Sequence, residues 1–143
     1  MVKIEGHEFP EDLYYHKEHM WVRLEDGKAR VGYNAWAAAA AGKLVSIKTR
    51  PAGKDVAAGK TLGSVESGKW VGSLKVPLSG IVLEINPALE GKPSVINDAP
   101  YGGGWVALIK PSNLDAELKN LIKGTDKSAL EAWIKEEKAK AGV

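Results

Sequence analysis

The sequence contains no cysteine, which excludes disulfides, thiolate nucleophiles and cysteine-bound metals. Any sulfur chemistry would therefore require a cofactor. The chain also lacks an apolar run approaching the roughly 20 residues that span a bilayer. Its first ten residues lack the apolar segment of a secretory signal. We therefore expect a cytoplasmic protein with no membrane partner.

An excess of charge is missing as well, because 20 Lys and Arg residues stand against 18 Asp and Glu residues, for a net charge of +2. Nucleic acid is therefore not expected as a partner. What is present fits one packed domain of 143 residues, with 44% hydrophobic and 27% charged residues. Sixteen Gly and seven Pro indicate many turns between short strands.

Alternating apolar residues predict a mainly β protein. The expected strands cover residues 14–15, 20–24, 29–33, 44–48, 61–66, 70–76, 81–85 and 105–109. Asp26-Gly27 predicts a tight hairpin turn between the second and third strands. Asn34 is a suitable N-cap for a short helix over residues 35–41, and Gly42 is a suitable end for it.

Beyond residue 110 the apolar spacing becomes helical. One helix is expected to carry Leu114, Leu118, Leu121 and Ile122, and a second to carry Leu130, Trp133 and Ile134. The prediction is a single domain over 1–143, with a β portion at about 13–110 and a C-terminal helical cover at about 112–138.

A lysine stands in the most distinctive predicted turn, Ser67-Gly68-Lys69-Trp70, between two apolar strands. Glycine at the first central position suits a type II′ turn, which would place Lys69 at the tip of a hairpin. Acylation of such an exposed amine would give a long, uncharged and flexible arm on a rigid mount. Lysines in hairpin turns are also common as ordinary solvated residues, so the turn alone leaves both interpretations open.

Further matches extend along the chain in one order. They are Lys17-Glu18-His19-Met20-Trp21-Val22, Val31-Gly32 followed by Trp36-Ala37 and Gly42, and the segments 63–69, 77–80, 84–86, 97–105 and 109–111. In order and spacing, these segments resemble the glycine cleavage system H-protein family of lipoyl carriers, over about residues 13–121.

The resemblance implies a lipoyl-domain-like hybrid of two sandwiched β-sheets, with a short inserted helix and C-terminal helices. It implies lipoate in amide linkage to Lys69, with Glu66, Ser67, Gly68 and Trp70 shaping the attachment turn and its recognition. Candidates for a cleft that receives the arm are His19, Met20, Trp36 and Ala40.

The resemblance also implies a non-catalytic carrier whose arm moves between partner enzymes. The implied partners are a lipoate ligase or lipoyl transferase and a dihydrolipoamide-type oxidoreductase. A monomer is expected, because a carrier has to dock at several sites.

Several positions depart from the glycine cleavage pattern, in which acidic and polar residues suit an aminomethyl cargo with a basic amine. Met20, Ala35, Ala38–Ala40 and Lys43 stand where the family has acidic or polar residues. A cationic cargo therefore loses partners. The Glu66–Gly72 segment resembles a divergent branch, the lipoate-binding proteins of the sulfur-oxidising heterodisulfide-reductase-like system.

We therefore predict that the arm carries sulfur-containing intermediates, with a heterodisulfide-reductase-like complex as partner. Aminomethyl transport in glycine cleavage is the alternative, and an unmodified interaction module is a second one. A biotin carrier is disfavoured, because biotin domains place Met on both sides of the lysine and this chain has Gly68 and Trp70. No catalytic constellation stands out. His16 and His19 lack a third metal ligand, and His19 is expected to pack near Trp21.

Overall fold

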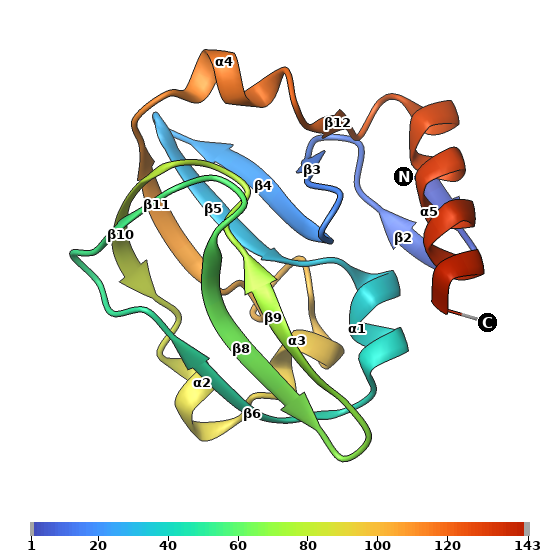
Figure 1. Ribbon diagram of the computed structural model, residues 1–143, viewed down its shortest axis with the longest axis horizontal. Coiled ribbons are helices and arrows are strands. Elements are labelled where there is room, and N and C mark those ends of the chain that lie inside the picture. Colours follow the sequence, from blue (N-terminus) through green and yellow to red (C-terminus); the bar gives the residue numbers. More distant parts are fainter. Residues whose placement is uncertain (1, 142–143) are drawn as a thin grey trace.

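Two antiparallel sheets share one hydrophobic core in the computed structural model, which describes residues 2–141 (Figure 1). The larger sheet has the strand order β12 (Ile122–Lys123), β3 (Tyr14–Tyr15), β4 (Met20–Glu25), β5 (Lys28–Tyr33), β11 (Ala107–Pro111), β10 (Gly80–Ile85) and β7 (Asp55–Val56). The smaller sheet has the order β6 (Leu44–Thr49), β8 (Thr61–Ser67) and β9 (Val71–Lys75). The predicted fold class, mainly β with a few helices, is confirmed.

Short helices lie around the edges of the sheets. They are α1 (Ala35–Ala41), α2 (Ala88–Gly91), α3 (Val95–Asp98) and α4 (Leu114–Leu118), followed by the longer α5 (Lys127–Ala141). Buried Leu130 and Ile134 attach α5 to the core, as their helical spacing predicts. No helix within residues 2–141 is long and apolar enough to cross a membrane.

Local turn chemistry explains the hairpin between β4 and β5 and the bounds of helix α1. Asp26 and Gly27 have φ values of 49° and 77°, which is the left-handed pair that a type I′ hairpin between β4 and β5 requires. In α1, the Asn34 side-chain oxygen accepts a hydrogen bond from the Ala37 amide at 2.8 Å. Gly42 ends this helix with φ 85°. Both predictions are confirmed.

The predicted helix over residues 114–122 is wrong in its second half. Helix α4 ends at Leu118, and Ile122 instead pairs with Tyr15 at the edge of the larger sheet. The Gly124 amide donates to the Leu13 carbonyl at 2.8 Å, in a site so tight that a Cβ would lie 2.6 Å from the Pro10 oxygen. Strand pairing with the chain's own N-terminal part therefore overrides the helical spacing of the leucines.

An N-terminal hairpin of β1 (Val2–Ile4) and β2 (His7–Phe9) was not predicted. Glu5 and Gly6 form its turn with φ values of 53° and 80°. The buried Phe9 ring meets the Trp133 ring edge-on at 6.2 Å, so the hairpin packs against α5 (Figure 1). Because β2 also contacts α1, the hairpin closes one side of the region between these helices.

Candidate functional site

The turn that carries Lys69 is the tip of the β8–β9 hairpin. Strand β8 buries Leu62 and Val65 in the core and pairs with β9 through Glu66 and Val71, which holds the tip rigidly. The Ser67 amide donates to the Trp70 carbonyl at 2.8 Å, so Gly68 and Lys69 form a two-residue tip.

The predicted type II′ geometry is wrong, because Gly68 does not have the positive φ that such a turn requires. The buried side chain of Ser67 shapes the turn instead. Its hydroxyl oxygen accepts from the Lys69 amide at 3.3 Å and donates to the Trp70 carbonyl at 3.4 Å. Serine often closes turns in this way, by bonding to backbone two residues ahead.

The Lys69 side chain is exposed, and its ammonium forms no hydrogen bond or ion pair with any other residue in the described range 2–141. Its aliphatic stem lies against Gly42 at the end of α1. A Cβ built on Gly42 would lie 2.9 Å from Lys69 Cε. The amine is therefore accessible to a modifying enzyme, and its stem points toward α1.

The segment beneath Lys69 is fixed by one half-buried amide side chain, that of Asn97. The Asn97 Nδ2 group donates to the carbonyls of Ala38 and Gly42, at 3.1 and 2.9 Å. The Asn97 oxygen accepts from the Leu44 amide at 2.9 Å. Asn97 thus joins the end of α1 to the start of β6 and keeps Gly42 in place under the lysine.

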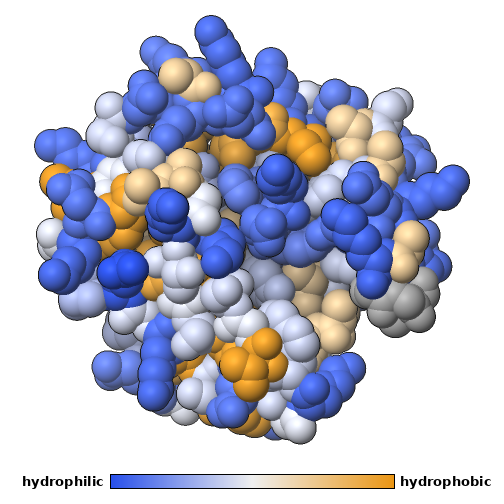
Figure 2. All heavy atoms as spheres, in the orientation of Figure 1, coloured by the Kyte–Doolittle hydropathy of each residue, from blue (hydrophilic) through white to orange (hydrophobic). Residues whose placement is uncertain are grey.

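Apolar side chains surround the hairpin tip on its outer face. Trp70 is 39% exposed and its indole covers Gly72, where any Cβ would clash with the ring. Val45, on the irregular stretch of β6 opposite Ser67, and Val71 are exposed as well. Figure 2 shows hydrophobic atoms, in orange, at the bottom of the molecule, where Figure 1 places the end of the hairpin. Glu66 adds an exposed carboxylate next to it.

A cleft of about 780 Å³ opens beside Lys69, within the usual size range of ligand sites. Its lining residues come from four elements, β2, β5, α1 and α5, and from the turns before β4 and between β8 and β9. They are His7, His19, Tyr33, Trp36, Ala37, Ala39, Ala40, Ala41, Lys69, Trp70, Glu137 and Lys140. Figure 2 shows the surface hollowed between the hairpin and α5. The walls contributed by α1 and Trp70 are apolar, which suits a long acyl chain.

The structure brings together most of the predicted cleft residues. His19, Trp36 and Ala40 line the cleft beside Lys69 and Trp70. Met20 does not, because it is fully buried in the core next to Trp21. Met20 and Trp21 point to opposite faces of β4 and are both buried, because both faces of the strand are covered here.

His19 occupies the inner part of the cleft and does not pack near Trp21 as predicted. Its ring is stacked between Trp36 and Trp133, with centroid distances of 5.1 and 5.0 Å. Its backbone has φ 75°, which is unusual for a residue other than glycine. This turn conformation aims the ring away from the strand and toward the two helices.

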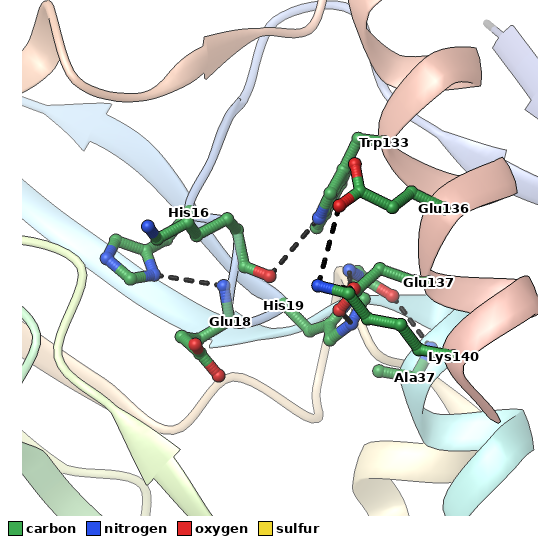
Figure 3. A network of polar contacts seen from close by, with 10 residues as sticks. His16, Glu18, His19, Ala37, Trp133, Glu136, Glu137 and Lys140 are labelled. Carbon is green, nitrogen blue, oxygen red and sulfur yellow. Dashed lines mark hydrogen bonds and ion pairs between the residues drawn. The ribbon is translucent and has the colours of Figure 1, made fainter.

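The tautomer of His19 follows from its partners. The Asn34 oxygen is used by the α1 N-cap, so the Asn34 Nδ2 group donates to His19 Nδ1 at 3.1 Å. The proton therefore resides on His19 Nε2, which donates to Glu137 Oε1 at 2.8 Å (Figure 3). Burial lowers the pKa of His19, although the bond to Glu137 acts in the opposite direction. A second proton would also displace the Asn34 donor.

Glu137 is the carboxylate among several cleft residues that were not predicted from the sequence. It comes from α5, 118 residues away from its partner His19. The only local signal is its spacing, since Trp133 and Glu137 are four residues apart and share one face of α5. Glu137 Oε2 also lies 3.5 Å from Lys140 Nζ. Figure 3 shows the three side chains converging from α5 and from the turn before β4.

Metal binding has no support in the described range 2–141, which contains no cluster of three His, Cys, Asp or Glu side chains suited to an ion. His16 Nδ1 instead accepts a hydrogen bond from the Glu18 amide at 3.1 Å.

Comparison with known proteins agrees with this geometry. The family model described as glycine cleavage H-protein matches residues 13–137. Glycine cleavage system H protein 5 of Aquifex aeolicus is 38% identical over 99% of this chain and 100% of that protein. The H protein of Bacillus velezensis is 39% identical over 79% of this chain and 88% of that protein.

A solved structure leads to the same family. The crystal structure of a glycine cleavage system H protein from Mycobacterium marinum has a TM-score of 0.76 to this fold, with 32% sequence identity. The similarity covers 86% of this chain and 98% of that one. This chain therefore belongs to the glycine cleavage H-protein family, whose members carry lipoate covalently attached to a lysine.

Proposed function

We propose that this protein is a single-domain, non-catalytic lipoyl carrier whose arm is attached to Lys69. The observation that carries the proposal is the position of the Lys69 amine, exposed and unpaired with any residue of the range 2–141, at a rigid hairpin tip beside the cleft. Tethering an arm there keeps its reactive end at high local concentration for each docked partner.

The residues around Lys69 fit such a group. Amide formation removes the lysine charge, so the extended chain can follow the stem past Gly42 into an apolar cleft walled by Trp36 and Ala40. When bound, lipoate supplies the pair of sulfur atoms that this cysteine-free chain lacks. Glu66, Ser67, Gly68 and Trp70 would present the turn to a lipoate ligase or lipoyl transferase.

The cargo best supported is the aminomethyl group of glycine cleavage, with the glycine cleavage enzymes and a dihydrolipoamide-type oxidoreductase as partners. Related proteins named as glycine cleavage H proteins support this alternative better than the sulfur-oxidation role predicted first. The sulfur prediction depended on lost acidic residues, and Glu137 returns one carboxylate to the cleft.

Transport of sulfur-containing intermediates toward a heterodisulfide-reductase-like complex is the second candidate. One observation favours it. The α1 face of the cleft consists of Trp36 and a run of alanines. The carboxylate of Glu137, on the α5 side of the cleft, is already paired with His19. A neutral or thiol-bearing arm would lose nothing in such surroundings.

The attachment site is tested by intact-mass measurement after expression with lipoate and a ligase. The mass should rise by one lipoyl group, and Lys69→Arg should abolish the rise because the guanidinium is not acylated. Lys43→Arg is the matched control, since Lys43 is also exposed and adjacent to Gly42. An unchanged mass for the wild type under several ligases, or a modified Lys69→Arg variant, would contradict the proposal.

The cargo is tested on the lipoylated protein with glycine decarboxylase and glycine. Aminomethyl transport predicts a mass increase of one aminomethyl group on the arm. The second candidate predicts no loading from glycine, and instead a mass increase of one sulfur atom when the reduced arm meets a persulfide donor.

A further inference from the structure

We propose that Glu137 is the residue that selects a cationic cargo on the arm, as the counter-ion for a protonated amine inside the cleft. This inference rests on the proposed lipoyl attachment at Lys69. It assigns the specificity to the C-terminal helix α5, away from the attachment turn.

Glu137 is the sole carboxylate among the described residues that line the cleft. The alanines of α1 and the two indoles add no acidic group to the lining, and the nearby Glu136 pairs with Lys140 without lining the cleft. The Glu137 side chain is only 21% exposed, so its charge is screened less than that of a surface carboxylate. For a cation that enters the cleft, Glu137 is therefore the lining residue that offers a carboxylate.

The Glu137 carboxylate is held in a defined direction. Oε1 accepts the Nε2 proton of His19, whose tautomer is set by Asn34 at the start of α1. His19 itself cannot rotate freely, because it is stacked between Trp36 and Trp133. His19 is thus a positioning residue that orients the carboxylate and leaves Oε2 as the oxygen available to a ligand.

The structure already contains a primary ammonium beside this oxygen. Lys140 Nζ lies 3.5 Å from Glu137 Oε2, and also 3.5 Å from Glu136 Oε1. The Lys140 side chain is 68% exposed and has this second partner, so it is a loosely held cation. An aminomethyl group on the arm has the same terminal chemistry and would replace Lys140 at Oε2 (Figure 3).

The test compares two adducts on the lipoylated, reduced protein. Formaldehyde with ammonia loads the cationic adduct: one S–C and one C–N bond form, and the carbonyl oxygen leaves as water. Formaldehyde alone loads a neutral S-hydroxymethyl group, in which the thiol adds across the C=O bond and nothing leaves. Neither reaction needs an oxidant or a reductant. After removal of free reagents, loss of each adduct is followed by intact mass at pH 7.

Glu137→Gln keeps an oxygen for His19 and nearly the same shape, so it removes the charge alone. We expect the aminomethyl adduct to be lost roughly tenfold faster from this variant, the scale of one charged hydrogen bond. The hydroxymethyl adduct should be lost at the wild-type rate. Glu136→Gln is the matched control, because Glu136 also pairs with Lys140 but does not line the cleft. It should behave as the wild type.

Equal aminomethyl loss from Glu137→Gln and wild type would overturn the inference. So would equally accelerated loss of both adducts, which would indicate a disturbed cleft rather than a lost counter-ion. The lipoylation of each variant is measured first. A wild-type protein that is never lipoylated would contradict the proposed function and this inference together, whereas normal lipoylation with unchanged loss contradicts the inference alone.

Discussion

At the scale of single residues, the site depends on the close approach of the Lys69 side chain to Gly42, which has no side chain of its own. Gly42 ends α1 with φ 85°, and the aliphatic stem of Lys69 lies against its Cα. Any other residue would be strained in this conformation and would push against the stem. Glycine therefore serves two purposes here: it ends the helix and it makes room for the arm.

Gly42→Ala should lower the free energy of unfolding by about 1–2 kcal/mol, through the left-handed backbone and the 2.9 Å approach of its Cβ to Lys69 Cε. Urea denaturation measures this. Gly91→Ala is the control, since Gly91 lies in a helix with open space around it and a negative φ. Equal stability of the two variants would contradict the role assigned to Gly42.

At the scale of elements, Asn97 in α3 reaches two consecutive segments far from it in sequence and ties the end of α1 to the start of β6. The Ala38 carbonyl also accepts from the Gly42 amide at 3.2 Å, and Asn97 adds a second donor there and one to the Gly42 carbonyl, just past the helix end. The amide side chain matches this site because it offers two donors and one acceptor at once. It thereby sets the path of the chain beneath the lysine.

Asn97→Asp should lower the free energy of unfolding by about 2–3 kcal/mol, because a carboxylate would face the carbonyls of Ala38 and Gly42 in place of a donor. Thermal or urea denaturation at pH 7 tests this. Asn120→Asp, at an exposed position, should change stability by less than about 0.5 kcal/mol. A comparable loss in both variants would show that the two carbonyls do not depend on Asn97.

At the scale of the whole molecule, folding couples to pH through the half-buried imidazoles of His16 and His19. Burial lowers the pKa of His19 and of His16 below the ordinary value of 6.5. As the pH falls below 6.5, these two histidines therefore bind protons more readily in the unfolded chain than in the folded protein. Their contribution to the free energy of unfolding is thus fully present above pH 6.5, and it is lost as the pH falls toward the folded-state pKa values.

Urea denaturation between pH 7.5 and 5.5 should show this loss, with a slope of at most about 1.4 kcal/mol per pH unit for each histidine. His19→Gln should reduce the slope, and His16 should account for what remains. The Glu25 carboxyl, whose pKa is lowered by its hydrogen bond from Arg30, affects stability only below its ordinary value of 4.5. A flat profile across this range would mean that His19 is protonated as easily in the folded state.

Much of this protein could be predicted from local sequence. Asp26-Gly27, the Asn34 cap and Gly42 act on their own backbone, so the turn and helix that they specify form as expected. The position of Lys69 between two apolar strands likewise placed it at a hairpin tip. The turn type was not predictable, because the Ser67 hydroxyl took over a role that the pattern assigned to Gly68.

Tertiary structure alone decided the rest. The leucines after residue 113 have helical spacing, yet residues 122–123 pair with the edge of β3. This pairing satisfies the backbone hydrogen-bonding groups of both segments. His19 and Glu137 are 118 residues apart, and no local pattern links them. By itself the sequence determined which lysine is presented; only the packing of α5 and the N-terminal hairpin against α1 decided what that lysine faces, because contacts between distant segments depend on the whole core.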